Sequence, residues 1–367
     1  MHWVRFIVAV GALALAGLPL LRAAETAAAG DFVAASDARF RYEGRFDTAD
    51  RAAPVVVWQA SRIALDFDGA TLTLQFDEAK DQSFFDVTID GRTTVEELRA
   101  GAAFRGTEFV GLGAGRHQLR LFKRSEATAG TVRFRGVRLA PGAHAYAPAA
   151  PAYRTTLLFI GDSITVGACN EDGESDQWEN RGTHNNALSY GALTAAAFDA
   201  DYRNIAVSGM GIVTGYVPFR AGEIWNRVSP SPTAPLADLA AWTPHVVFVN
   251  FGENDDSYTR VHQQVFPAAA FTQGYVALVQ AIRAAYPSAT IVVLRGGMFG
   301  GAQSERLREP WQAAVAQLEK GDAHVTHYVF EHWSRTHPRV ADDRVMADEL
   351  VAWLSRQPFM AGLAAKK

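Results

Sequence analysis

The stretch LLFIGDSITVGACNEDGESDQWENRGTHNNALSYG occupies residues 157–191 and decides how the second half of the chain folds. Residues 157–160 are all apolar, which is typical of a strand that is buried on both faces. The strand ends on Gly161-Asp162-Ser163, and a long polar segment follows before a helical pattern begins near residue 187. Ligands bind beyond the carboxyl ends of the strands in a parallel sheet, so a serine at this point is a candidate nucleophile.

Apolar runs of strand length alternate with helical stretches from residue 155 to residue 360. This alternation predicts an α/β domain with three layers, in which a parallel sheet is covered by helices on both faces. Polar or small residues follow several of the predicted strands, and a histidine precedes the last helix. These residues are Ser163, Gly209, Asn254 and His337.

The four residues match the requirements of acyl transfer. Ser163 supplies a hydroxyl, Gly209 an unobstructed backbone amide, Asn254 a neutral amide side chain, and His337 an imidazole. A nucleophile, two oxyanion donors and a base are the groups that this chemistry needs. Structural roles are also open, because Ser163 could cap a helix, Gly209 could serve a tight turn, and Asn254 could form an Asx turn.

His337 is the favoured base among ten histidines. Pro338 follows it and is suited to the start of a helix, which places His337 at the end of a loop. His324 and His327 instead lie in an apparent strand, where packing or surface roles are expected.

The first half of the chain has a different periodicity. Short alternating segments, separated by turns such as Asp68-Gly69 and Asp90-Gly91, run through residues 31–140. They predict an all-β sandwich. The Ala- and Pro-rich residues 141–154 are predicted to be a linker, so that the second domain covers residues 155–360.

Residues 1–24 are predicted to be a signal peptide, with Arg5 in its positive region and an apolar run over residues 6–21. The run is short for a membrane span, and we expect a secreted or periplasmic protein with no span in the mature chain. An uncleaved N-terminal anchor is the alternative.

Charge and cysteine content exclude several classes of protein. The formal net charge of −4 provides no basic surface for nucleic acid. The single cysteine, Cys169, excludes an intrachain disulfide and a Cys-rich zinc site. Acids cluster in residues 171–179 without EF-hand spacing, so we expect no metal and no organic cofactor. We also expect a monomer.

The ordered motifs resemble those of the SGNH (GDSL-type) hydrolases. The matching blocks are GDSI at residues 161–164, Gly209, GEND at residues 252–255, and His337-Pro338. The two-domain order resembles carbohydrate esterase family 2, in which a jelly-roll domain precedes an SGNH domain. The resemblance implies that Ser163 is the nucleophile and His337 the base, and that the N–H groups of Ser163 and Gly209 and the Asn254 amide form the oxyanion hole.

The sequence departs from the SGNH pattern at the acid of the triad. An Asp normally lies three residues before the histidine, and Ser334 stands there in this chain. A Ser163–His337 dyad, with a main-chain carbonyl orienting the ring, is the favoured explanation and has a precedent in family 2. Glu331, or an acid from elsewhere such as Asp342, could complete a triad instead, or the protein could bind sugars without catalysis.

The polar segment after Ser163 is a candidate rim for sugar recognition. Trp178, His184 and Asn185 are predicted to stack on or hydrogen-bond a sugar, and the nearby acids to discourage anionic substrates. A solvated surface loop is the alternative. The prediction is therefore a serine O-acetyl esterase acting on an acetylated polysaccharide or oligosaccharide. A different short-chain ester or thioester hydrolase, a lipase-like enzyme and a non-catalytic carbohydrate-binding protein remain open.

Overall fold

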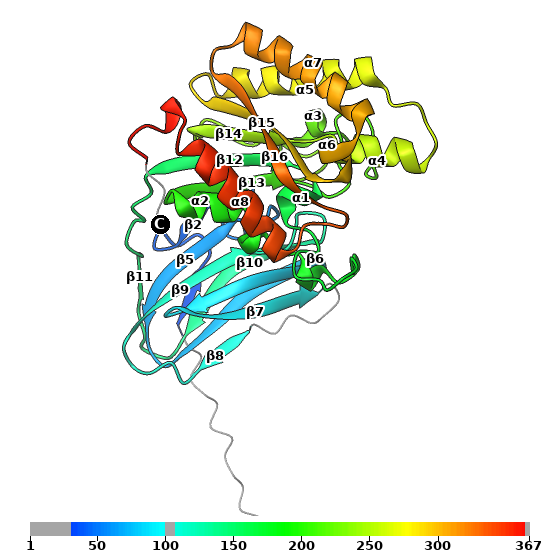
Figure 1. Cartoon of the computed structure of the whole chain (residues 1–367). Helices are drawn as coiled ribbons and strands as arrows, with labels where there is room; N and C mark the ends of the chain where they lie inside the picture. Colours follow the sequence, from blue (N-terminus) through cyan, green and yellow to red (C-terminus); the bar gives the residue numbers. More distant parts are fainter. Residues whose placement is uncertain (1–30, 100–106, 364–367) are drawn as a thin grey trace, which may run out of the picture.

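The computed structural model describes residues 31–99 and 107–363 of the chain. The predicted signal peptide lies outside these residues. A sheet-rich N-terminal domain is followed by an α/β domain with a parallel sheet, in the predicted order (Figure 1). In the part of the chain that the structure describes, no helix has the length and apolar character needed to cross a membrane.

The N-terminal domain consists of antiparallel strands. They are β1 (Phe32–Ala34), β2 (Arg41–Glu43), β3 (Phe46–Asp47), β4 (Val55–Val56), β5 (Arg62–Asp68), β6 (Thr71–Ile89), β7 (Arg92–Arg99), β8 (Glu108–Val110), β9 (Arg116–Lys123), β10 (Gly130–Leu139) and β11 (Ala145–Tyr146). The long strand β6 belongs to both halves of the domain. Its first part pairs with β10 and its second part with β7 and β9. The jelly-roll connectivity of this domain stays a prediction.

The domain core follows from the alternation seen in the sequence. Buried and more exposed residues alternate along the first part of β9. Its inward residues Leu119 and Leu121 pack in one apolar cluster with Phe67, Phe85 and Phe134. Burial of these large side chains is the main stabilising contribution to the sandwich.

The predicted linker is not wholly irregular. Residues 145 and 146 form β11, which pairs with β5 of the sandwich. The sandwich therefore extends beyond the predicted boundary at residue 140, because the chain adds one more short strand before it crosses to the second domain.

The second domain is built on a five-stranded parallel sheet. Its strands are β12 (Thr155–Gly161), β13 (Ala200–Ala206), β14 (Val246–Asn250), β15 (Thr290–Met298) and β16 (Val325–Ser334), in the order β13-β12-β14-β15-β16. Its helices are α1 (Ser163–Val166), α2 (Tyr190–Ala197), α3 (Ala221–Ile224), α4 (Glu253–Val261), α5 (Ala268–Ala285), α6 (Phe299–Gln303), α7 (Glu305–Gly321) and α8 (Val340–Leu354). Single turns of 3₁₀ helix cover Arg181–Thr183, Asn186–Leu188 and Pro358–Met360.

The two faces of the sheet bury different residues of the same strands. Leu158 and Ile160 of β12 pack with residues of α3, α5 and α7, whereas Leu157 and Phe159 pack with residues of α2 and α8. Figure 1 shows the two helical layers on either side of the sheet. The three-layer arrangement predicted from the apolar runs is thus present.

The two domains share apolar packing. Val57, Trp58 and Ala127 of the N-terminal domain belong to the same buried cluster as Leu158 and Ile160 of β12. Trp58 has no exposed surface. The sandwich is therefore packed directly onto the α/β domain.

Candidate active site

Ser163 lies at the end of the first parallel strand. Strand β12 ends at Gly161 and helix α1 begins at Ser163, with Asp162 between them as the helix N-cap. The Asp162 carboxylate accepts the Ile164 N–H at 3.1 Å. A Cβ atom on Gly161 would meet Thr165 Oγ1 at 2.2 Å, so only glycine fits this turn. Burial raises the pKa of Asp162 well above its ordinary value.

Ser163 lines an open cleft of about 890 Å³. Gly209, Asn254 and His337 line the same cleft, so the structure brings together the four residues that were predicted from strand ends. They follow β13, β14 and β16, whose carboxyl ends meet at one edge of the parallel sheet.

Two backbone N–H groups are available to an oxyanion. Within residues 31–99 and 107–363, the N–H groups of Ser163 and Gly209 have no hydrogen-bond partner. Gly209 has φ of +79°, a left-handed conformation that glycine adopts without strain. The Asn254 amide donates to Met210 O at 3.0 Å and to Asp162 Oδ2 at 3.2 Å.

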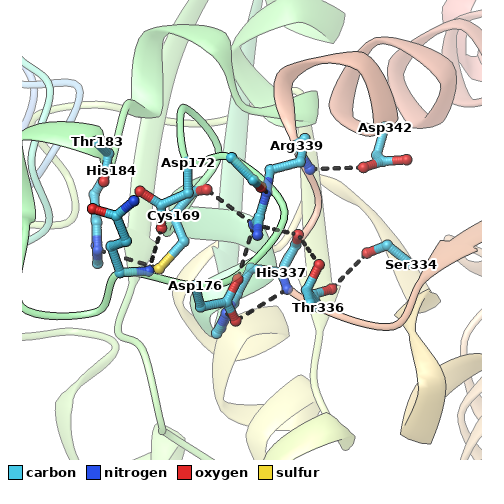
Figure 2. Close-up of polar contacts among 12 residues, drawn as sticks. Cys169, Asp172, Asp176, Thr183, His184, Ser334, Thr336, His337, Arg339 and Asp342 are labelled. Atoms are coloured by element: carbon cyan, nitrogen blue, oxygen red, sulfur yellow. Dashed lines mark hydrogen bonds and ion pairs between the residues drawn. The ribbon is translucent and has the colours of Figure 1, made fainter.

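His337 has a carboxylate partner that was not predicted. The imidazole Nδ1 lies 2.7 Å from Asp176 Oδ2 (Figure 2). A hydrogen bond at Nδ1 leaves Nε2 unprotonated in the neutral ring, which is the form that a general base needs. Ser163 Oγ has no hydrogen bond to this ring in the described part of the chain. Catalytic hydrogen bonds are often long before substrate binds.

Arg339 holds Asp176 on its other side. Its guanidinium Nη1 lies 2.9 Å from Asp176 Oδ1, and it also donates to Cys169 O and Gly173 O. Burial alone would raise the pKa of Asp176, but the hydrogen bonds from His337 and Arg339 outweigh it and lower the pKa to about 2. Asp176 is therefore ionised at every pH at which such an enzyme would be assayed.

The acids expected from the sequence lie elsewhere. Glu331 is exposed and makes no contact with His337 among the described residues. Asp342 accepts from His332 Nε2 at 2.7 Å and from Arg339 N at 2.8 Å. Ser334 Oγ donates to Thr336 O at 2.6 Å. The carboxylate beside His337 is thus Asp176 and not Glu331, and which group acts with His337 in catalysis stays a prediction.

The predicted sugar-binding residues separate into two groups. Trp178 lines the cleft. His184 and Asn185 are buried, and Asn185 bonds to Glu171 Oε1 and Ala187 N, so neither is placed on the cleft. Their role as substrate-binding residues stays a prediction, which the burial of both side chains does not support.

Trp178 is already surrounded by side chains. Its ring stacks on His337 with centroids 5.8 Å apart and an angle of 30°, and the Arg181 guanidinium lies 4.2 Å from its centroid. We therefore expect Trp178→Ala to lower kcat on p-nitrophenyl acetate and on an acetylated glycan alike. The loss should be on the order of 10²-fold, as for other displacements of a catalytic group. A loss confined to the glycan would instead assign the indole to sugar stacking.

The N-terminal domain contributes to the cleft. Thr128 lines it, and Glu126 lies fully buried beside it. The Glu126 carboxylate accepts the Ser208 N–H at 3.1 Å and pairs with Arg181 at 3.1 Å. Glu126 of the sandwich therefore fixes Ser208, which precedes Gly209, and Arg181, which packs on Trp178.

Asp255 of the GEND block has a structural role. Its buried carboxylate accepts the N–H groups of Ile212, Val213 and Thr214 at 2.8–3.0 Å. Burial raises its pKa to about 6, against the effect of these three donors. It thereby fixes the loop that follows Gly209.

Asp255→Ala leaves three backbone donors without their acceptor, so we expect it to lower the free energy of unfolding by about 3 kcal/mol. Urea denaturation measures this. Asp348→Ala, at an exposed position of α8, is the matched control and should have little effect. An unchanged midpoint for Asp255→Ala would contradict the structural role.

Cys169, Asp176 and His337 offer ligand atoms within 4.8 Å of one another. A soft metal ion would need the thiolate, and burial raises the pKa of Cys169 far above its ordinary value. Arg339 also occupies one oxygen of Asp176. The group fits a hydrogen-bonded catalytic network better than a metal centre.

Comparison with known proteins agrees with this geometry. Residues 42–174 match the carbohydrate esterase 2 N-terminal family, and residues 159–349 match the GDSL-like Lipase/Acylhydrolase family. The chain is 30% identical over 318 residues to an acetylxylan esterase / glucomannan deacetylase of Cellvibrio japonicus, covering 82% of this chain and 85% of that protein. The chain belongs to carbohydrate esterase family 2.

Other family 2 proteins extend the comparison. The cellulase/esterase CelE of Acetivibrio thermocellus is 30% identical over 327 residues, and the match covers 85% of this chain but 38% of that longer protein. A family two carbohydrate esterase from Clostridium thermocellum, solved with cellohexaose, has a TM-score of 0.75 at 27% identity, covering 86% of this chain and 98% of that one. The present family 2 protein is a serine-type carbohydrate acetyl esterase.

Proposed function

We propose that Ser163, His337 and Asp176 remove acetyl groups from an acetylated polysaccharide through an acetyl-enzyme. The observation that carries the proposal is the 2.7 Å contact between His337 Nδ1 and Asp176, at the edge of the cleft that holds Ser163. A carboxylate at this position orients the ring and stabilises the imidazolium that forms during proton transfer.

The first half of the reaction forms the acetyl-enzyme. Ser163 Oγ attacks the acetyl carbonyl carbon while its proton moves to His337 Nε2. The tetrahedral intermediate then collapses, the C–O bond to the sugar breaks, and the leaving sugar oxygen takes the proton from His337. Asp176 stays ionised throughout, in agreement with its lowered pKa.

The second half repeats these steps with water as the nucleophile. His337 takes a proton from water, which attacks the acetyl carbon. Acetate leaves as Ser163 regains its proton from His337. In both halves the N–H groups of Ser163 and Gly209 would donate to the negatively charged oxygen. The Asn254 side-chain amide would also donate to this oxygen. The N–H involved is the one that donates to Asp162 in this structure, so that it would form two hydrogen bonds at once.

The substrate and the location of the enzyme belong to the same proposal. Its relative from C. japonicus is named for acetylxylan and glucomannan, and a neighbouring structure holds cellohexaose. An open cleft is suited to a sugar chain that extends beyond the acetylated unit. We infer that the protein acts on such polysaccharides as a secreted or periplasmic monomer.

Acetate release from acetylated xylan, acetylated glucomannan and O-acetylated peptidoglycan tests the proposal. We expect release from at least one plant polysaccharide, and hydrolysis of p-nitrophenyl acetate in preference to longer acyl esters. Binding without acetate release would indicate a carbohydrate-binding protein, and preference for long acyl chains would indicate a lipase-like enzyme.

A further inference from the structure

The cleft has an excess of positive charge. Arg181, Arg260 and Arg335 line it, and Glu253 is the one carboxylate among the described lining residues. This contrasts with the formal net charge of −4 for the whole chain. The three arginines differ in how far their charges are neutralised by neighbouring carboxylates.

Arg181 has its own counter-ion. Its guanidinium lies 3.1 Å from the buried carboxylate of Glu126. Arg260 shares its counter-ion. It lies 3.5 Å from Asp256, but Arg306 already pairs with that carboxylate at 2.8 Å. The carboxylate of Asp256 is thus shared between two arginines.

Arg335 has no counter-ion in the described part of the chain. It follows β16 directly, it is exposed, and no hydrogen bond or ion pair joins it to residues 31–99 or 107–363. Glu253 accepts the Gly301 N–H at 2.9 Å, and burial raises its pKa although the nearby charge of Arg260 acts to lower it. Arg335 is therefore the cleft arginine that no carboxylate among the described residues pairs with, whereas Arg260 has a shared ion pair.

Phe299 and Trp333 are two of the aromatic side chains that line the cleft with these arginines. Phe299 is 41% exposed and meets Trp333 edge to face, with centroids 6.1 Å apart. The Arg260 guanidinium lies 5.3 Å from the Phe299 centroid. An aromatic surface packs against the apolar face of a sugar, and a guanidinium binds a carboxylate with two parallel hydrogen bonds.

We propose that this side of the cleft binds a sugar that carries a carboxylate, a uronic acid unit, in the acetylated chain. The inference rests on the proposed acetyl esterase function and names its substrate class. It reverses the expectation that the acids of residues 171–179 discourage anionic substrates. None of those acids lines the cleft. Glu171 contacts Arg124, and Asp176 is bound by His337 and Arg339.

The test compares two acetylated xylo-oligosaccharides of equal length, one with and one without a glucuronic acid unit. We expect kcat/KM for acetate release to be roughly tenfold higher for the acidic substrate at low ionic strength. Added NaCl should reduce the ratio, because salt screens exposed charges.

Arg335→Gln should bring the ratio of the two kcat/KM values close to one, and Arg335→Lys should retain part of it, since lysine keeps the charge but not the planar fork. Arg92→Gln is the matched control, because Arg92 is exposed on β7 and does not line the cleft. It should leave the ratio as in the wild type.

The possible outcomes distinguish a failure of the uronic acid inference from a failure of the proposed function. Acetate release from both substrates with a wild-type ratio near one, or an unchanged ratio in Arg335→Gln, would overturn the uronic acid inference alone. A wild type that releases acetate from neither substrate, and from none of the polysaccharides above, would overturn the proposed function and this inference with it.

Discussion

Ser163→Ala is expected to lower kcat for acetyl ester hydrolysis by on the order of 10⁶-fold. Without the Oγ atom no acetyl-enzyme forms, and the oxyanion donors can only assist a slow direct attack by water. Acetate release from an acetylated polysaccharide and hydrolysis of p-nitrophenyl acetate should fall together, because both substrates pass through the same covalent step.

The fold should tolerate this change. The Ser163 side chain makes no hydrogen bond within residues 31–99 and 107–363, so its removal leaves no partner unsatisfied there. Ser355→Ala, just beyond α8, is a matched control that should keep full activity. If purified Ser163→Ala turned over at a rate near that of the wild type, the nucleophile would have to lie elsewhere.

Asp176→Asn is expected to lower kcat by on the order of 10⁴-fold, the loss seen when the acid of a serine triad is replaced. The amide keeps the size of the side chain but removes the charge that stabilises the imidazolium. The amide can also present either its oxygen as an acceptor or its nitrogen as a donor to the His337 ring, so it does not fix the tautomer of the ring. Steady-state kinetics on p-nitrophenyl acetate measure the effect without a contribution from glycan binding.

A pH–rate profile distinguishes a positioning role from a general loss of structure. The lowered pKa of Asp176 keeps its charge at any assay pH, and its stabilising contribution is lost only as the pH falls from its ordinary value near 3.8 towards 2. Asp176→Asn should therefore lower kcat/KM by a similar factor across the assay range, since the charge that it removes is present at every assay pH.

Glu331→Gln is the control for this prediction, because it removes one charge from the same region without touching His337. It should be nearly silent. The reverse result, with Glu331→Gln impaired by orders of magnitude and Asp176→Asn active, would favour Glu331, which the sequence offered as one alternative to the dyad.

The sequence was sufficient to predict that the residues following several strands lie in one cleft. Ser163, Gly209 and Asn254 come within four residues of the ends of buried strands, and parallel strands bring their carboxyl ends to one edge of a sheet. His337 could be selected by its place before the last helix. These predictions depended on local pattern and on one general property of α/β sheets.

The acid could not be found in this way. Asp176 lies in an irregular loop, 161 residues before His337, and no periodicity relates the two. Arg339 brings them together by holding the loop through Gly173 O and Cys169 O. The acids after Ser163 were a signal, but several stood there, and the sequence did not distinguish Asp176, which contacts His337, from the others.

The sandwich shows a similar division. Its strands were predicted from alternation within residues 31–140, yet the alternation did not show that the single strand β6 extends over Thr71–Ile89. The missed strand β11 has only two residues, which is too short for any periodicity. The length of β6 and the presence of β11 both depend on the strands with which they pair, and strand pairing is determined by tertiary structure.

The buried contact of Glu126 with Ser208 and Arg181 limits how freely the hydrolase domain can be exchanged between proteins, in evolution or by design. A catalytic centre with groups from both domains cannot be moved by transplanting the hydrolase half onto a foreign partner. We expect such a chimaera to expose the apolar surface around Leu158 and to lack the carboxylate at Ser208. We therefore expect the two domains to evolve together. Substitutions at the domain interface should be tolerated as rarely as substitutions beside Ser163.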